Sequence, residues 1–262
     1  MIGIGATLFK RAVMGSRGFS PSALFANGEE GAWYDPSDLS TLFEEDGTTP
    51  ASVDGPVGKI LDKSGNGNHL IQTTETKCPT LKLAGGLYYL EFDGVDDGLQ
   101  TSSIDFTGTD AMTVFAGSRK ENDAAENITE LSANSGANAG TFRMNAQTNN
   151  IWRYSSRGSS ALRNINAGGY TPPVTSVLTG LSDISDDTLI IRVDGVQKNS
   201  STNDQGTGNY GNYPLNVGAR NNAAGLNLDG RIYSLIVRGA LSNADELAST
   251  EAYVAVKTGV SI

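Results

Sequence analysis

Residues 88–98 read Tyr88-Tyr89-Leu90-Glu91-Phe92-Asp93-Gly94-Val95-Asp96-Asp97-Gly98, and this stretch decides the fold class. Apolar side chains at Tyr88, Leu90 and Phe92 alternate with other residues, which predicts a β-strand with one buried face. The Asp-Gly pair that follows predicts a tight turn, because glycine adopts the positive φ that such turns need. Further Asp-Gly pairs lie at Asp46, Asp54, Asp97, Asp194 and Asp229. This density of turn signals predicts an all-β protein.

The strands are expected to form a two-sheet antiparallel sandwich. Apolar segments separated by Gly, Asn and Asp recur every 8–15 residues or so, a spacing typical of packed β-sheets. A single helix is expected after the last strand. Ser242 is its predicted N-cap, Asp245 and Glu246 lie near the positive end of the helix dipole, and Gly259 is the predicted stop. The clearer predicted strands cover residues 58–61, 80–83, 87–92, 112–118, 128–132, 141–145, 150–155, 174–181, 188–193, 215–219 and 231–238.

Four segments are predicted along the chain. Residues 1–28 form an amino-terminal arm, residues 29–56 a linker with a short helical turn, residues 57–241 the sandwich, and residues 242–262 a helix and tail packed on it. The arm has apolar residues without the period of a strand. We expect them to be buried against the domain's own surface or a neighbouring protein, so that the arm attaches the chain to an assembly. The predicted attachment residues are Leu8, Phe9, Phe19, Leu24 and Phe25.

The charge balance argues against two classes of partner. The net charge is −10 and the sequence pI is about 4.6. Nucleic acids and anionic membranes are bound through Lys/Arg patches, and the basic cluster that stands out here is Lys10-Arg11 with Arg17. One cysteine, Cys78, excludes an intrachain disulfide. The first residues carry their charges after the apolar run, which is the wrong order for a secretory signal, and no run is long enough to span a membrane.

Four further motifs stand around the opening stretch. They are residues 62–69 (Asp-Lys-Ser-Gly-Asn-Gly-Asn-His), residues 188–196, residues 215–220 and residues 229–237, the last of which starts Asp-Gly-Arg-Ile-Tyr. In this order and at these separations the motifs resemble those of laminin-G-like, concanavalin A-like jelly-roll domains. The resemblance covers about residues 57–248. It implies a jelly-roll sandwich and says little about function.

A second resemblance concerns the two ends of the chain. Residues 31–43 (Gly-Ala-Trp-Tyr-Asp-Pro-Ser-Asp-Leu-Ser-Thr-Leu-Phe), 58–65 and 253–260 are similar to blocks in tailed-bacteriophage structural proteins that carry this jelly roll. The resemblance implies a non-enzymatic component of the virion surface, either a tail-fibre or adhesion protein or a capsid decoration protein. It implies synthesis in the host cytoplasm and contacts with other virion proteins through the arm. It leaves homo-oligomers open.

The enzyme alternative rests on Glu91, Asp93 and Asp96. Laminarinase-type glucanases of the same fold use Glu-x-Asp-x-x-Glu, in which two carboxylates flank the glycosidic bond. Here the third position is the shorter Asp96, and Gly94 interrupts the strand before it. His69 is the single histidine, without a nucleophile motif or clustered metal ligands. We therefore predict no catalytic residues, and no cleft with two facing carboxylates.

Two binding sites are predicted. Tyr210, Asn212 and Tyr213 lie in one short loop where aromatic rings can stack on sugars and amides can read hydroxyl groups, so a host-surface glycan is the expected ligand of a carbohydrate-binding adhesin. Asp96 and Asp97 offer hard oxygens to calcium, although Asp-Gly is also ordinary turn chemistry. No other cofactor is expected, since the Gly-rich phosphate and dinucleotide motifs are absent from the sequence.

Overall fold

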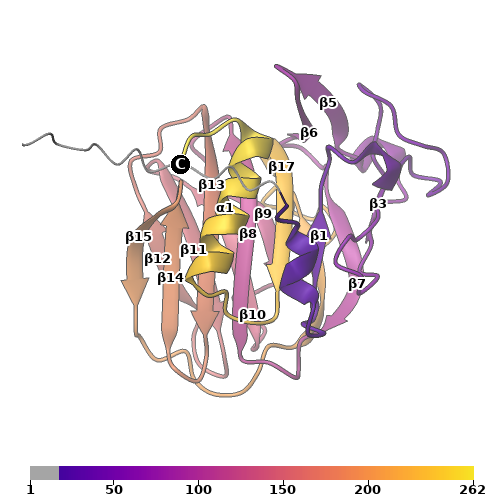
Figure 1. Cartoon of the computed structure of the whole chain (residues 1–262). Coiled ribbons are helices and arrows are strands. Elements are labelled where there is room, and N and C mark those ends of the chain that lie inside the picture. The colour runs from indigo at the N-terminus through magenta and orange to yellow at the C-terminus, as the bar shows by residue number, and fades with distance from the viewer. Residues whose placement is uncertain (1–17) are drawn as a thin grey trace, which may run out of the picture.

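Two antiparallel sheets packed face to face make up the protein, as a computed structural model that describes residues 18–262 shows (Figure 1). Sheet A has the order β15 (Val196–Ser201), β14 (Thr188–Val193), β13 (Val174–Asp183), β8 (Ala111–Lys120), β17 (Asp229–Arg238), β6 (Leu87–Asp93) and β5 (Thr80–Ala84), and β1 (Gly31–Tyr34) also pairs with β17. Sheet B has the order β12 (Arg163–Ala167), β11 (Ile151–Arg157), β10 (Thr141–Gln147), β9 (Glu126–Leu131), β16 (Asn212–Val217), β7 (Leu99–Asp105), β4 (Leu70–Ile71), β3 (Lys59–Ile60) and β2 (Leu42–Phe43). The predicted fold class is confirmed.

The helical elements are few and lie outside the sheets. They are α1 (Ala244–Thr258) and the short 3₁₀ turns η1 (Pro21–Phe25), η2 (Leu39–Thr41) and η3 (Glu75–Lys77). No helix within residues 18–262 is long and apolar enough to cross a membrane.

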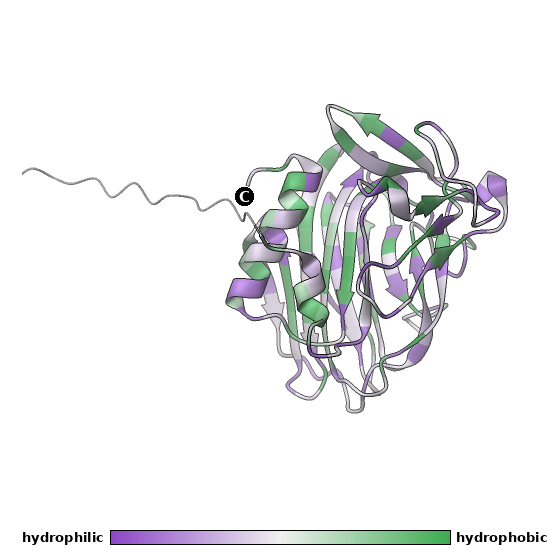
Figure 2. Ribbon diagram, turned by 45° about the vertical axis from the view of Figure 1, so that its right-hand side comes forward, coloured by the Kyte–Doolittle hydropathy of each residue, from purple (hydrophilic) through white to green (hydrophobic). Residues whose placement is uncertain are grey.

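The main core lies between the sheets and follows from side-chain alternation. On β10, Phe142, Met144 and Ala146 are fully buried in it, while Arg143 and Asn145 point to the opposite face of sheet B. The same alternation of hydrophobic and hydrophilic residues runs along many of the strands in Figure 2.

A second apolar cluster lies on the outer face of sheet A, under α1. Phe115, Val177 and Ile236 of three neighbouring strands pack there against Val254 and Ala255 of the helix. The helix begins one residue later than predicted. Its N-cap is Asn243, whose side chain accepts from the backbone of Glu246 in a capping box, and Gly259 ends it with φ of 71° as predicted.

The predicted boundaries at the amino-terminal end are wrong in two respects. The segment 29–56 is not a linker, because β1 and β2 within it pair with β17 and β3 of the sandwich. Residues 18–28 are not a separate arm either. Leu24 and Phe25 are buried in the cluster under α1 and Phe19 packs against it, because apolar side chains gain stability by leaving water. Leu8 and Phe9 lie outside the described residues.

Asp35 joins three segments that are distant in sequence, residues 31–43, 58–65 and 253–260. This buried carboxylate, 2% exposed, accepts hydrogen bonds from Tyr253 at 2.7 Å and from Lys257 at 3.0 Å, and Lys63 lies 3.5 Å away. Burial opposes the charged form, but these bonds and those from Ser37 outweigh it and lower the pKa of Asp35. The three segments therefore share a structural role, which is to fix β1 and α1 to the loop after β3.

Candidate functional site

The outer face of sheet B is the surface available for binding. The outer face of sheet A is covered by α1, which packs on β8, β13 and β17. Sheet B carries no such helix in the described part of the chain (Figure 1). Loops cover the middle of this face, where Ser155, Glu130 and Asn216 are buried and the loops that hold Ser135 and Arg220 contact Glu130. Side chains nearer its two ends, such as Asn164 and Gln100, are accessible to a ligand.

A continuous row of polar residues crosses this face. Residues paired across a β-ladder point to the same side of the sheet. Strand register therefore places on one face a line of residues that runs from β12 to β7. In spatial order the line is Asn164, Ser155, Arg143, Glu130, Asn216 and Gln100.

Hydrogen bonds fix several members of this row. The Ser155 hydroxyl donates to Asn164 at 2.7 Å, and the Gln100 amide donates to Asn216 at 2.7 Å. Asn216 in turn donates to the Ser132 carbonyl at 2.9 Å. The row is thus pre-organised, which lowers the entropy cost of binding a ligand. We call this row, together with Arg143, Arg153, Arg157 and Arg220, the polar face.

The polar face ends in a hollow beside Gln100. The hollow has a volume of about 400 Å³, within the range of small-ligand sites. Amide and hydroxyl side chains contribute most of its lining, which is the chemistry that recognises sugar hydroxyls. Its lining residues are Ile71, Gln72, Thr73, Gln100, Thr101, Ser102, Pro214 and Asn222.

Arginines set the charge of the polar face. Arg143, Arg153 and Arg157 lie on it by register, and Arg220 reaches it from the loop after β16 to pair with Glu130 at 2.8 Å. Sequence reasoning missed this group and singled out the amino-terminal cluster instead. A signal was present, because residues 131–182 contain four arginines and no aspartate or glutamate in a chain of net charge −10.

The predicted glycan loop is not a stacking platform. Tyr210 is 1% exposed, and its hydroxyl hydrogen-bonds to Ser182 at 2.6 Å and Ser156 at 2.7 Å inside the sandwich. Burial raises its pKa to about 12. Tyr213 is half-buried and packs against the core, and only Asn212 is exposed. The prediction for Tyr210 is therefore wrong, because the loop uses both rings for packing.

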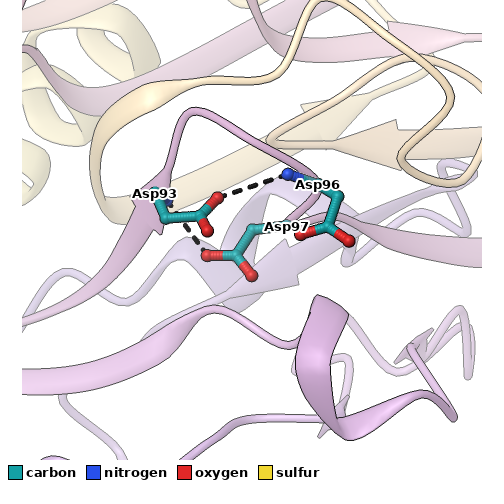
Figure 3. Close-up of side chains that lie close together, drawn as sticks. All are labelled: Asp93, Asp96 and Asp97. Atoms are coloured by element: carbon teal, nitrogen blue, oxygen red, sulfur yellow. Dashed lines mark hydrogen bonds between the residues drawn. The ribbon is translucent and has the colours of Figure 1, made fainter.

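The predicted acidic pair is brought together, and Asp93 joins it (Figure 3). Carboxylate oxygens of Asp93, Asp96 and Asp97 lie within 4.8 Å of one another in the turn after β6. Asp97 accepts from the Asp93 backbone at 3.0 Å, and Asp93 accepts from the backbone of Val95 at 2.8 Å. Burial, reinforced by the neighbouring Asp93 and Asp96, raises the pKa of Asp97 to about 7. These bonds explain the turn, and calcium binding stays a prediction.

Acidic residues also share a cavity at this edge of the sandwich. Glu91, Asp93, Asp97, Glu121 and Asp229 line a space of about 210 Å³, and the absence of a catalytic cleft with two facing carboxylates stays a prediction. The space is smaller than the roughly 300–1,000 Å³ of small-ligand sites. Glu91 lies 3.7 Å from Arg231 and 3.9 Å from Lys82, as expected of a surface charge cluster.

Comparisons with known proteins show the fold. No protein-family model matches the chain, and no curated protein matches it. Solved structures do match. One is described by the words "Cell entry of botulinum neurotoxin type C is dependent upon interaction with two ganglioside molecules", with 9% identity, TM-score 0.60, and coverage of 90% of this chain and 53% of that one. The binding domain of Paraclostridial Mosquitocidal Protein 1 has 12% identity, TM-score 0.58, and coverage of 74% and 49%.

The botulinum neurotoxin serotype G binding domain is also similar in structure, with 13% identity, TM-score 0.56, and coverage of 74% of this chain and 48% of that one. This chain thus spans about half the length of each of these structures. At such low identity the likeness shows a shared β-sandwich.

Proposed function

We propose that the protein is a non-enzymatic, carbohydrate-binding domain of an adhesin, and that the polar face of sheet B binds the glycan. The observation that carries the proposal is the 400 Å³ hollow lined by amide and hydroxyl side chains, at the end of a hydrogen-bonded row of polar residues. Neighbouring structures support it at the level of class, since one is a neurotoxin binding domain and another belongs to a neurotoxin whose cell entry depends on two ganglioside molecules.

The setting we propose is the surface of a tailed-phage particle, as a tail-fibre or capsid decoration protein. This part rests on the sequence resemblance of residues 31–43, 58–65 and 253–260. Many copies on one particle raise the effective concentration of binding sites, so that weak contacts of single domains add up to firm adhesion to a host.

A blocking experiment tests the glycan site. Ser102 is exposed and lines the hollow, and Gln197 is exposed on β15 of the opposite sheet. Each is replaced by cysteine and labelled with a bulky maleimide. The native Cys78 stays unlabelled because it is buried, and burial together with nearby carboxylates raises the pKa of its thiol to about 12.

We expect binding on a panel of bacterial-surface glycans to be lost in labelled Ser102→Cys and kept in labelled Gln197→Cys. Equal binding by both labelled proteins would place the site elsewhere. An unmodified protein that binds no glycan of the panel would contradict the function itself.

A further inference from the structure

Arg143 is a buried cation whose Nε atom has no partner in the described part of the chain. It lies on β10, an inner strand of sheet B, with 9% of its surface exposed, and no residue among 18–262 accepts a hydrogen bond from its buried Nε atom. Leaving a buried charge unpaired is costly, so native proteins pair almost all of them. Such a group is explained when a ligand supplies the missing acceptor.

The carboxylate opposite Arg143 is already occupied. Glu130 is fully buried and faces Arg143 across the β9–β10 ladder, but it forms a two-pronged ion pair with Arg220, at 2.8 and 2.9 Å. It also accepts from the Ser135 backbone at 2.6 Å. Glu130 therefore has little capacity left for a second guanidinium.

The remaining neighbours are neutral or cationic. Arg153 donates to the Asn166 side chain at 2.8 Å, and Arg157 donates to the carbonyls of Ser160 and Gly136. Burial lowers the pKa of Arg143, and the nearby Arg220 and Arg153 add to this effect against the opposing Glu130. Counted by side chains, this part of the polar face has more cations than anions.

We propose that Arg143 binds the acidic group, a carboxylate or a sulfate, of a glycan on the polar face. The inference rests on the proposed function and names the chemical class of its ligand, an acidic glycan. A planar guanidinium recognises both groups through paired N–H donors, and its bonds to an anion strengthen where water is excluded.

The position of Arg143 fits a ligand that extends from the hollow. Three ladders separate Gln100 on β7 from Arg143 on β10, which at about 4.8 Å a strand is roughly 14 Å. An oligosaccharide is long enough to place hydroxyls at Gln100 and an acidic group at Arg143. Nucleic acid fits less well, because it is recognised by extended Lys/Arg patches, and the whole chain carries a net charge of −10.

The test uses pairs of oligosaccharides that are identical except for one acidic group. One arm compares carboxylated sugars with their neutral methyl esters, and the other compares sulfated with unsulfated sugars. Binding is measured for the full chain, for Arg143→Gln and for Arg163→Gln. Arg163 is a matched control, because it loses the same charge but lies opposite the core-side Ser156 and donates to the Asp204 carbonyl.

We expect the unmodified chain to prefer the acidic member of at least one pair by about tenfold or more. Arg143→Gln should abolish the preference, and Arg163→Gln should retain it. The arm that shows the preference identifies carboxylate or sulfate. Equal binding of acidic and neutral members, or a preference that survives in Arg143→Gln, would overturn the inference while leaving the glycan-binding function intact. Tighter binding of single-stranded DNA than of every acidic glycan would also overturn it.

Two additional measurements cover the remaining outcomes. If Arg143→Gln fails to give the far-ultraviolet circular dichroism of the parent, Arg153→Gln at the neighbouring position of the same face replaces it, with the same expected loss. If no glycan binds, the melting temperature is measured with increasing acetate or sulfate. A rise that is larger in the parent than in Arg143→Gln would support the anion site alone, and equal rises would contradict it.

Discussion

At the scale of the residue, burial decides what each polar side chain can do. Tyr210 has the loop position of a ligand-binding aromatic, yet its ring fills the core because Ser156 and Ser182 satisfy its hydroxyl. Those serines lie 54 and 28 residues away in sequence. No local pattern contains that information, so its burial was not predictable. For Asp97, the predicted proximity to Asp96 is confirmed. Burial, however, raises the pKa of Asp97, so that its side chain holds a proton at higher pH than an ordinary aspartate.

The raised pKa of Asp97 predicts a specific pH dependence of stability. The unfolded chain releases this proton near pH 3.9, as ordinary aspartates do, while the folded protein holds it until about pH 7. Between these values the folded state binds the extra proton, so its stability is greatest at the acidic end and falls as pH rises towards 7. Glu126, whose pKa burial also raises to about 7, adds to the same slope.

Asp97→Asn should therefore reduce the loss of stability between pH 5 and pH 8, measured as urea midpoints at both values. Asparagine keeps an oxygen that accepts from the Asp93 backbone, so the turn should persist. Asp186→Asn, at an exposed position outside this turn, is the control and should leave the difference unchanged. An undiminished difference in Asp97→Asn would mean that this carboxyl does not hold a proton at neutral pH.

At the scale of the element, strands with apolar alternation were predictable and polar ones were not. All eleven predicted strands coincide with observed strands to within a few residues. The strands missed were short or lacked alternation. β15, for example, is an edge strand whose first five residues are all exposed, so it leaves no hydrophobic pattern. β1 was missed because its four residues, Gly-Ala-Trp-Tyr, are all buried and show no period of two.

The network at Asp35 predicts how elements depend on one another. Asp35→Asn removes the negative charge that holds Lys257 of α1 and lies beside Lys63. We expect a loss of about 2–3 kcal/mol in the free energy of unfolding, less than the roughly 3–5 kcal/mol of a fully buried pair, because both lysines are about one-fifth exposed.

Urea unfolding at pH 7 measures this loss, with Asp186→Asn as control. Asp186 is exposed, so the control changes the net charge equally without touching a buried group. A loss below about 0.5 kcal/mol in Asp35→Asn would show that Tyr253 and Ser37 alone hold these elements together.

At the scale of the whole molecule, the two faces of the sandwich have separate roles. Sheet A is covered by α1 and by the segment from Phe19 to Phe25, which includes η1, while sheet B carries the polar face. The outline of this sandwich was predictable from turn chemistry and alternation. The polar face was not predictable, because its residues come together only through the register of strands that are distant in sequence.

This arrangement changes the attachment prediction. Phe19, Leu24 and Phe25 belong to the folded domain, so in the proposed phage setting we assign attachment to residues 2–17. Deleting residues 2–17 should keep the melting temperature within about 2 °C and should prevent incorporation into the particle.

Deleting residues 2–28 should instead lower the melting temperature, because it uncovers the apolar cluster under α1. Incorporation of the 2–17 deletion at normal copy number would contradict attachment through this segment.

The two ends of the described chain lie on the same side of the sandwich. Phe19 and Val260 both pack on the cluster beneath α1, and Ile262 lies beside the turn between β14 and β15 (Figure 1). A fluorescent protein, a lipid anchor or a sensor chip linked after Ile262 would thus sit behind sheet A. The molecule is then held with sheet A towards its support and with the arginines of the polar face directed away from it. This orientation makes it suited to oriented immobilisation without redesign.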